Sequence, residues 1–289
     1  MDGKVVLVTG ANTGIGKETA AAVAARGATT LLACRNVAKA HEAAADIQAM
    51  TGNEKVVVLH LDLKDLAVVE RCASDVSERF GRVDVLVNNA GGWWSSREVT
   101  AQGFEQTFAV NYLGHYALTR LLLESLRHAA PSRIVNATSL AHWFVRGINW
   151  DDLQSERQWR PPLAYAQSKL ALILFTRELA RRLDDSGIVV HVGHPGVVRS
   201  RFGEDGDLHG ASKALLRVSM LVSVPPARGA RTSIHLATAP QVMNSNGGYW
   251  ANAKPARPSR AARDDDAARR LWDVSEELVT GVGITLPSY

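Results

Sequence analysis

Short runs of apolar residues recur along the chain and alternate with longer segments whose apolar residues return every three or four positions. The first run, residues 4–8, is apolar almost throughout, which predicts a strand buried on both faces of a sheet. Further strands are predicted at 28–33, 55–61, 83–87, 134–137, 189–192 and 247–251. Helices are predicted at 17–26, 37–50, from 111 toward 127, 164–183, 228–237 and 267–279. This alternation predicts one α/β domain over residues 1–289.

The composition is that of an ordinary soluble globular protein. The chain has 289 residues, of which 46% are hydrophobic and 21% are charged. Its formal charge of +4 is mild and arises partly from scattered arginines rather than from one basic stripe. We therefore expect no nucleic-acid partner.

The cysteines and the start of the chain predict a cytoplasmic location. Cys34 and Cys72 are the only cysteines and lack metal-ligand spacing, so neither a disulfide framework nor a zinc site is predicted. The chain opens with Met-Asp-Gly-Lys, without a basic and apolar leader, and no window reaches about 18 uninterrupted apolar residues. We expect a cytoplasmic protein without a transmembrane segment.

The sequence TGANTGIG, residues 9–16, joins the first predicted strand to the first predicted helix. In such a turn Gly10 would permit the tight bend, Gly14 would let the backbone approach a pyrophosphate, and Gly16 would bring helix and strand together. A tight turn without a ligand is the alternative, but the strand, glycine loop and helix in this order favour nucleotide binding. The other loop residues predicted to contact the nucleotide are Asn12, Thr13 and Ile15.

The second predicted strand is followed by Arg35 and Asn36, where an NAD site would carry a carboxylate for the ribose 2′-hydroxyl. The Arg35 guanidinium can instead pair with a 2′-phosphate through two hydrogen bonds. This predicts NADP(H) as cofactor, with Asn36 beside it. A solvated loop arginine is the alternative.

The next two strands also end in polar or small residues, at the carboxyl edge where a parallel sheet binds its ligand. Asp62 could accept a hydrogen bond from an adenine amino group, and Asn89 could tie neighbouring strands together. Asp and Asn are also ordinary turn formers at strand ends, so both explanations stay open. The cofactor-contacting set predicted here is Asp62, Leu63, Asn89, Ala90 and Gly91.

Tyr165 and Lys169 lie four residues apart in a predicted helix, so their side chains share one face. A lysine cation close to a phenol favours the phenolate, which would lower the tyrosine pKa toward working pH and make it a proton donor and acceptor. Taken alone, a Tyr-x-x-x-Lys pattern is most often a solvated helix face.

These features together resemble the short-chain dehydrogenase/reductase family, and more narrowly its retinol-dehydrogenase-like branch. The family motifs are TGANTGIG at 9–16, NNAG at 88–91, Asn111, Ser139, the Tyr165/Lys169 pair and HPG at 194–196. The branch is indicated by ACRN at 33–36, NYLGHYALT at 111–119, RIVNATSLAH at 133–142, DLQSE at 152–156, SKLALILFTRELARRL at 168–183, HPGVVRS at 194–200 and LWDVSEEL at 271–278. The resemblance spans nearly the whole chain but does not fix a substrate.

The resemblance implies a Rossmann-type, doubly wound parallel sheet of about seven strands in the order 3-2-1-4-5-6-7, with helices on both faces. It also implies that Asn111, Ser139, Tyr165 and Lys169 are the catalytic set. Hydride would pass between nicotinamide and a carbonyl carbon, while Tyr165 exchanges the proton on the oxygen. Strand periodicity does not choose between the Thr138 and Ser139 hydroxyls; the family pattern chooses Ser139. The bend that it places beneath the nicotinamide comprises Pro195, Gly196 and Val198.

Several segments are predicted to surround a lipophilic small-molecule substrate. Residues 197–226 would form a lid, with a membrane-contacting segment as the alternative. The aromatic residues expected near the pocket are Trp93, Trp94, Trp143, Phe144 and Trp159, of which Trp93, Trp94 and Trp143 are the predicted substrate contacts beside Ser139 and Tyr165. His191 and His194 lack a further ligand, so no metal is predicted. The charged run 254–266 is expected at the surface, with the border of the pocket or a subunit contact as the alternative. A homo-oligomer stays open.

Two alternatives belong to other functional classes. A regulatory or scaffold protein could keep the NADP-binding fold without turnover, although the intact Asn111, Ser139, Tyr165 and Lys169 argue against it. A nucleotide-sugar epimerase on a related sheet would need a larger C-terminal region than this chain has.

Overall fold

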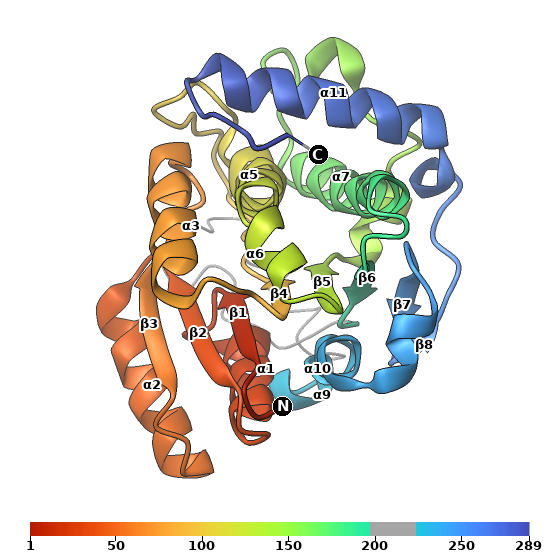
Figure 1. The fold of residues 1–289 in the computed structure, drawn as a ribbon. Coiled ribbons are helices and arrows are strands. Elements are labelled where there is room, and N and C mark those ends of the chain that lie inside the picture. Colours follow the sequence, from red (N-terminus) through yellow and green to blue (C-terminus); the bar gives the residue numbers. More distant parts are fainter. Residues whose placement is uncertain (197–223, 289) are drawn as a thin grey trace.

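A computed structural model describes residues 1–196 and 224–288. Its centre is a single sheet of eight strands in the order β3-β2-β1-β4-β5-β6-β7-β8 (Figure 1). All neighbouring strands run parallel except β7 and β8. The predicted parallel sheet and the order of its first seven strands are confirmed. The strands are β1 Val5–Thr9, β2 Thr29–Cys34, β3 Val56–His60, β4 Val85–Asn88, β5 Ser132–Ala137, β6 Ile188–His194, β7 Tyr249–Ala251 and β8 Lys254–Pro255.

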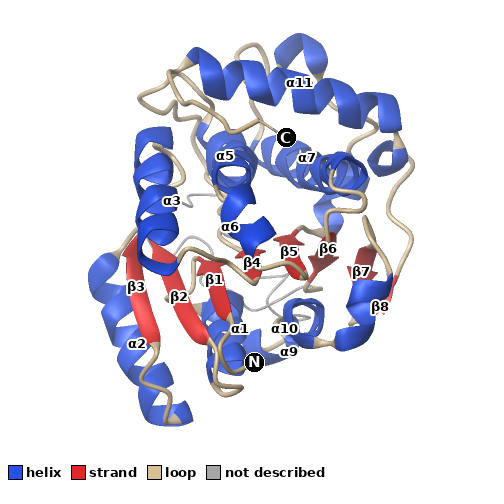
Figure 2. Ribbon diagram, viewed as in Figure 1, coloured by secondary structure: helices blue, strands red, loops and turns tan. Residues whose placement is uncertain are grey.

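Helices cover both faces of the sheet (Figure 2). One face carries α1 Gly14–Ala24, α2 Val37–Thr51, α9 Pro226–Gly229 and α10 Arg231–Thr238. The other carries α3 Leu66–Phe80, α5 Gly114–Leu121, α6 Leu123–His128 and α7 Pro161–Arg182, with α11 Asp265–Gly281 packed outside α7. The short helical segments are α4 Gln106–Phe108, η1 Ala109–Leu113, η2 Leu140–Phe144, η3 Trp150–Asp152, η4 Pro240–Asn244 and η5 Ala261–Arg263.

Alternate strand residues feed two separate cores, which explains why the strands read as continuous apolar runs. In β1, Val5 and Leu7 pack among the residues of α3, α5, α7 and α11. Val6 and Val8 point the opposite way and pack against α1, α2 and α10. Because successive side chains of a strand face opposite sides, a sheet covered by helices on both faces needs apolar residues at every position.

Several elements differ from the sequence prediction. Helix α3 was not predicted, although Asp65 caps its start and Gly81, at φ +67°, ends it. The helix predicted from 111 toward 127 is instead a π-helical turn, η1, followed by α5 and α6. Strand β8 was also missed, because two residues are too short to produce a periodic pattern.

The charged run 254–266 has its charged side chains at the surface, as predicted. All of its charged side chains are exposed, whereas the uncharged Ala262 is fully buried in the core shared with α7 and α11. Ser259 is also buried, and its N–H donates to His142 Nε2 at 3.3 Å. The run therefore connects the C-terminal helix to the loop that follows β5.

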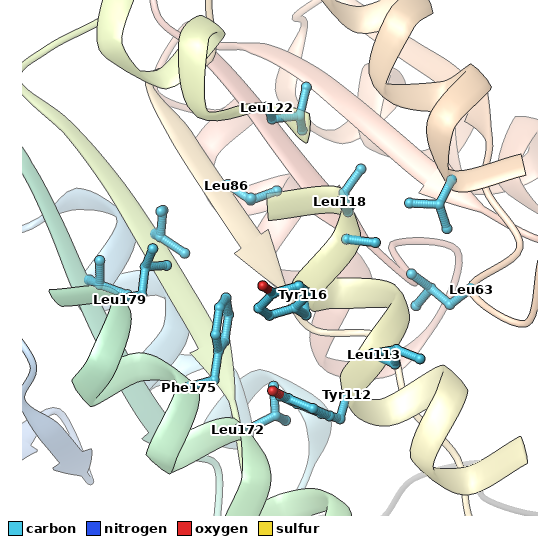
Figure 3. Packing of buried hydrophobic residues seen from close by; sticks show 14 of the residues in the cluster. Leu63, Leu86, Tyr112, Leu113, Tyr116, Leu118, Leu122, Leu172, Phe175 and Leu179 are labelled. Atoms are coloured by element: carbon cyan, nitrogen blue, oxygen red, sulfur yellow. The ribbon is translucent and has the colours of Figure 1, made fainter. Parts of the chain in front are cut away.

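A group of aromatic side chains joins α7 to the helices beside it. Phe175 on α7 contacts Tyr112 and Tyr116, with ring centroids 6.1 and 5.5 Å away (Figure 3). Trp272 of α11 closes the group against Tyr116 and Phe175, at 5.2 and 5.9 Å. These contacts fix the position of α7, the helix that carries Tyr165 and Lys169.

The structure does not test the predictions for Val198 and for most of the lid. Val198 and all but the last three residues of the expected lid at 197–226 lie outside the described residues. Within 1–196 and 224–288, none of the helices combines the length and apolar character needed to cross a membrane.

Candidate active site

The loops that carry the predicted site residues emerge from the same edge of the sheet. Strands β1, β2, β4, β5 and β6 are parallel neighbours, so their carboxyl ends meet along one line. The glycine loop follows β1, Arg35 follows β2, Asn89 follows β4, Ser139 follows β5 and Pro195 follows β6. Sequence segments that are far apart thus converge where an α/β sheet binds nucleotides.

The glycine loop has the geometry that nucleotide binding requires. Gly10 adopts φ +64°, and a Cβ on Gly16 would lie 2.3 Å from the Gly10 carbonyl oxygen, so α1 packs directly on the strand end. A Cβ on Gly14 would meet no atom within 4 Å, so this part of the backbone faces open space. Thr13 is the N-cap of α1, and its side chain makes no capping hydrogen bond. The N–H groups of the first turn therefore suit an anion such as a pyrophosphate.

The other loop residues and the β2 end lie beside this N-terminus. Asn12 and Ile15 are half-buried in the loop. Arg35 is exposed, two residues beyond Ala33, which pairs with Thr9. Asn36 caps α2, because its Oδ1 accepts from the Lys39 N–H at 3.0 Å. The arginine predicted to select a 2′-phosphate is thus at the surface next to the glycine loop.

After β3, Asp62 forms a turn, and after β4, Asn89 ties two strands together. Asp62 Oδ1 accepts from the Lys64 N–H at 3.0 Å, and Leu63 is buried in the core. Asn89 Nδ2 donates to the Thr9 carbonyl at 2.9 Å, which confirms that Asn89 ties β4 to β1. The N–H groups of Asn89 and Ala90 both donate to Thr9 Oγ1 at 2.9 Å. A contact of Asp62 with adenine stays a prediction.

Tyr165 and Lys169 share a face near the start of α7, as their spacing predicted. Lys169 Nζ lies 5.6 Å from the centroid of the Tyr165 ring and donates to the Ala137 carbonyl at 3.1 Å. The lysine is only 4% exposed, and burial lowers its pKa to about 8. Its ammonium is thus desolvated at the carboxyl edge of the sheet.

The expected lowering of the tyrosine pKa is wrong for this structure. Burial raises the pKa of Tyr165 above its ordinary value of 10.0, and a hydrogen bond with Ser139 only partly opposes that effect. Desolvation dominates because the phenolate would lose its hydration, while the lysine lies over the ring and bonds a carbonyl. The phenol is therefore protonated at neutral pH, a state suited to donating a proton.

The structure distinguishes the two hydroxyls at the end of β5. Thr138 is 4% exposed, and its Oγ1 donates to the Lys169 carbonyl at 2.8 Å, so it anchors the backbone of α7. Ser139 is half-buried, forms the hydrogen bond with Tyr165 and accepts from the Ala141 N–H at 3.2 Å. Of the two, Ser139 has its hydroxyl beside the tyrosine.

Asn111 is completely buried in the π-helical turn, and its side chain is held on three sides. Its Oδ1 accepts from the Gly92 N–H at 2.8 Å, and its Nδ2 donates to the Gly92 carbonyl at 2.9 Å and to Ser168 Oγ at 3.1 Å. These contacts join the loop after β4 to α7. The polar atoms of the side chain are thereby satisfied by neighbouring elements of the protein.

The three tryptophans predicted to contact the substrate occupy different environments. Trp93 stacks on Tyr165, with ring centroids 5.6 Å apart and an interplanar angle of 15°. Trp94 is 8% exposed and packs under Gly92, so we assign it to the packing of the loop rather than to a substrate surface. Trp143 is 54% exposed on η2, beside the exposed Phe144. Trp159 is half-buried and donates to Glu105 Oε1 at 3.2 Å.

Two residues that sequence reasoning did not single out lie within this network. Thr9 receives the hydrogen bonds from Asn89 and Ala90, and His115 contacts both Thr9 and the Asn111 carbonyl. His115 could have been found from its spacing, because it lies four residues after Asn111 and so about one helical turn away on the same face. Among residues 1–196 and 224–288, the structure contains no cluster of three His, Cys, Asp or Glu side chains that could hold a metal ion.

The buried lysine predicts how stability depends on pH. Below about pH 8 Lys169 is charged in both the folded and the unfolded state. Between about pH 8 and its ordinary pKa of 10.5, the folded state releases the proton while the unfolded state keeps it, so the free energy of unfolding rises with pH. We expect the wild type to gain about 2 kcal/mol over Lys169→Met between pH 7 and pH 10. Urea unfolding of both proteins measures this, and parallel pH dependences would contradict it.

The chain is similar to known proteins both in sequence and in fold. The sequence model of the family described as "short chain dehydrogenase" matches residues 4–207. Human retinol dehydrogenase 13 is 45% identical over 291 residues, which cover 99% of this chain and 86% of the relative. A solved structure of an uncharacterized protein from Mycobacterium paratuberculosis has a TM-score of 0.78 and 34% identity, covering 99% of this chain and 96% of that chain. A Pseudomonas aeruginosa RhlG/NADP active-site complex has a TM-score of 0.69 and 25% identity, covering 87% and 95%.

Proposed function

The chain belongs to the short-chain dehydrogenase family, and on that premise we propose that it is an NADP(H)-dependent oxidoreductase. It interconverts a lipophilic alcohol with its aldehyde or ketone, and Tyr165 is the acid/base. The observation that carries the proposal is the placement of Tyr165, Ser139 and the buried Lys169 together at the carboxyl edge of a sheet whose glycine loop offers an uncapped helix N-terminus.

The residues at this edge fit a nicotinamide dinucleotide. The first turn of α1, with Gly14 facing open space, would hold the pyrophosphate, and Arg35 would hold the 2′-phosphate of NADP(H). The loop after β4 and Pro195-Gly196 after β6 would border the nicotinamide ribose and ring. When bound, the cofactor supplies or accepts the hydride.

Side chains of the protein transfer the proton. In the reducing direction, Tyr165 Oη donates its proton to the carbonyl oxygen, and it takes the proton back in the oxidising direction. The Ser139 hydroxyl is hydrogen-bonded to Tyr165, so a carbonyl oxygen that reaches the tyrosine is also close to the serine. Ser139 orients this oxygen by a hydrogen bond. Lys169 places a cation next to the ring and stabilises negative charge that develops on the phenol oxygen.

The substrate side of the site is apolar and aromatic. Trp93 lies flat against Tyr165, while Leu140, Trp143 and Phe144 are 43%, 54% and 77% exposed on the segment directly after Ser139. Apolar surface next to a proton donor favours a lipophilic substrate. The relatives named retinol dehydrogenases make retinal and retinol members of the class to test.

A panel of carbonyl substrates tests the proposal. NADPH consumption is followed by absorbance for aldehydes and ketones of increasing apolar size, with retinal and steroids included, and alcohols are tested with NADP in the reverse direction. We expect turnover to increase with apolar size. Binding of NADPH without turnover on any of these substrates would favour the non-catalytic alternative and overturn the proposed activity.

Arg35 should determine the preference for NADPH over NADH. Arg35→Ala removes the charged hydrogen bonds to the 2′-phosphate. The net loss of one such bond, about 1.5–3 kcal/mol, corresponds to a rise in KM for NADPH of about 10- to 100-fold, so we expect a rise of at least this size. The KM for NADH, which lacks this phosphate, should stay within about twofold. Steady-state kinetics with both cofactors measure the effect. Arg26→Ala is the matched control, because Arg26 is exposed just beyond the far end of α1. Equal use of NADH and NADPH by the wild type would contradict the assignment.

A further inference from the structure

His115 is a buried, polar side chain at the junction of three elements of the site. It follows the π-helical turn in α5 and is 0% exposed. Its Nε2 lies 3.0 Å from Thr9 Oγ1, at the end of β1, and its Nδ1 lies 3.3 Å from the Asn111 carbonyl oxygen. The imidazole therefore bridges the strand that leads into the glycine loop and the turn that contains Asn111.

The hydrogen bonds of Thr9 determine which imidazole nitrogen carries the hydrogen. A hydroxyl has one hydrogen to donate and two lone pairs to accept with. The N–H groups of Asn89 and Ala90 use both lone pairs, each at 2.9 Å. The hydroxyl hydrogen is then left for His115 Nε2 at 3.0 Å, which is closer than the Val87 carbonyl at 3.5 Å. His115 Nε2 is thus an acceptor, and Nδ1 carries the hydrogen and donates to Asn111.

The chain of contacts continues from Asn111 to the lysine. The Asn111 side chain bonds Gly92 and Ser168, the residue directly before Lys169. A Cβ built on Gly91 would lie 3.0 Å from Asn111 Oδ1 and 3.3 Å from Lys169 Nζ, so both groups converge on the same glycine. A displacement of the Asn111 turn would therefore move the surroundings of the ammonium.

The imidazole is neutral, which matters because Lys169 is near. Burial lowers the pKa of His115 to about 3, the hydrogen bond to Asn111 opposes this, and the Lys169 charge lowers it further. The other partners of the ring, Thr9 and Asn111, are uncharged. A protonated imidazole could not accept from Thr9 and would place a second cation near the lysine.

We propose that His115 is a positioning residue for the reaction: as the neutral tautomer with hydrogen on Nδ1, it fixes the Asn111 turn relative to the end of β1 and so holds Lys169 in place beside Tyr165. This rests on the proposed oxidoreductase function. The residue touches neither substrate nor cofactor, so its effect reaches the reaction through Asn111 and Lys169. A histidine that merely fills the core would affect stability alone.

Two substitutions separate the two ends of the imidazole. In His115→Asn the amide nitrogen takes the place of Nδ1 and keeps the donor to Asn111, but the contact with Thr9 is lost. In His115→Gln the amide oxygen takes the place of Nε2 and keeps the acceptor for Thr9, but the donor to Asn111 is lost. If both ends are needed, each variant lowers kcat about five- to tenfold, as the loss of one hydrogen bond predicts, with little change in substrate KM. The alkaline limb of the kcat–pH profile, which reports Lys169 and Tyr165, should also shift.

A double-mutant cycle with Thr9 tests whether the contacts act as one unit. Thr9→Val removes the hydroxyl at nearly constant shape, and Thr9→Ser restores it and should recover most of the lost kcat. Thr9→Val also removes the acceptor for the Asn89 and Ala90 N–H groups, so it should be the more damaging single substitution. Adding His115→Asn to it should lower kcat no further, because the hydroxyl that His115 contacts is already absent. Additive losses, or variants that lose stability while keeping kcat and its pH profile, would overturn the proposal.

Nitrogen NMR of the imidazole gives a readout that needs no turnover. In the wild-type protein the chemical shifts should show a protonated Nδ1 and an unprotonated Nε2 between pH 5 and pH 8. Hydrogen on Nε2, or titration of the ring in that range, would overturn the assignment. If no carbonyl substrate is turned over, the oxidoreductase proposal fails, while the NMR result and a stability cycle of the same variants still decide whether His115 links Thr9 to Asn111.

Discussion

Replacing Tyr165 by phenylalanine is expected to lower kcat about 10²- to 10⁴-fold, the usual contribution of a positioned proton donor. The substitution removes one hydroxyl and leaves the ring, which stacks on Trp93 and lies 5.6 Å from Lys169 Nζ. The packing at the start of α7 should therefore persist, and affinity for NADPH should stay within about twofold. Single-turnover reduction and fluorescence titration with NADPH measure the two quantities separately.

Tyr112→Phe is the matched control for the loss of a buried tyrosine hydroxyl. Tyr112 is 0% exposed, and its hydroxyl lies 2.7 Å from Ser275 Oγ on α11, on the side that faces the C-terminal helix. This variant should lose some stability and keep its turnover within about twofold at a temperature at which it is folded. If Tyr165→Phe retained more than a tenth of the wild-type kcat, Tyr165 would not be the proton donor.

The sheet could be predicted because burial on both faces leaves a strong signal. Strands such as β1 send Val5 and Leu7 to one core and Val6 and Val8 to the other, so apolar residues run without interruption. The glycine loop could be predicted as well, because its requirements are local: a positive φ at Gly10 and no room for a side chain at Gly16. Local requirements of this kind are visible in a single sequence.

The π-helical turn could not be predicted because tertiary contacts decide it. Residues 109–113 have no periodicity that distinguishes a π turn from an α-helix, but the turn directs the buried Asn111 side chain to Gly92 and Ser168. Strand β8 likewise exists because Pro255 pairs with Trp250 across a tight turn, not because of its own sequence. The π-helical turn thus depends on partners that are distant in sequence, and β8 is too short for its own residues to produce a pattern.

The ionisation of the site could be predicted only in part. The spacing of Tyr165 and Lys169 correctly placed them on one helix face, and a nearby cation was expected to dominate the tyrosine pKa. The structure shows that desolvation dominates for both groups, because Lys169 is only 4% exposed and lies against the Ala137 carbonyl. The extent of burial depends on how α7, β5 and the loop after β4 pack, which spacing alone does not contain.

The position of α7 depends in turn on the C-terminal helix. Arg120 is 1% exposed, and its guanidinium lies 5.1 Å from the Trp272 ring while donating to Glu276 at 3.1 Å. The guanidinium of Arg182, at the end of α7, lies 4.5 Å from the centroid of the same indole ring. Trp272 thus packs its indole from α11 against α5 and α7 and offers an aromatic surface to two cations.

Replacing Trp272 by alanine is therefore expected to lower the free energy of unfolding by about 3–5 kcal/mol, the usual cost of removing a large buried side chain. The loss should be at the upper end of this range, because the buried Arg120 would also lose the aromatic ring against which its charge lies. Urea unfolding followed by circular dichroism measures the change. Trp143→Ala is the control, because Trp143 is 54% exposed and should cost less than about 1 kcal/mol. Equal losses for the two tryptophans would show that α11 does not hold α7 in place, since the buried indole would then contribute no more than an exposed one.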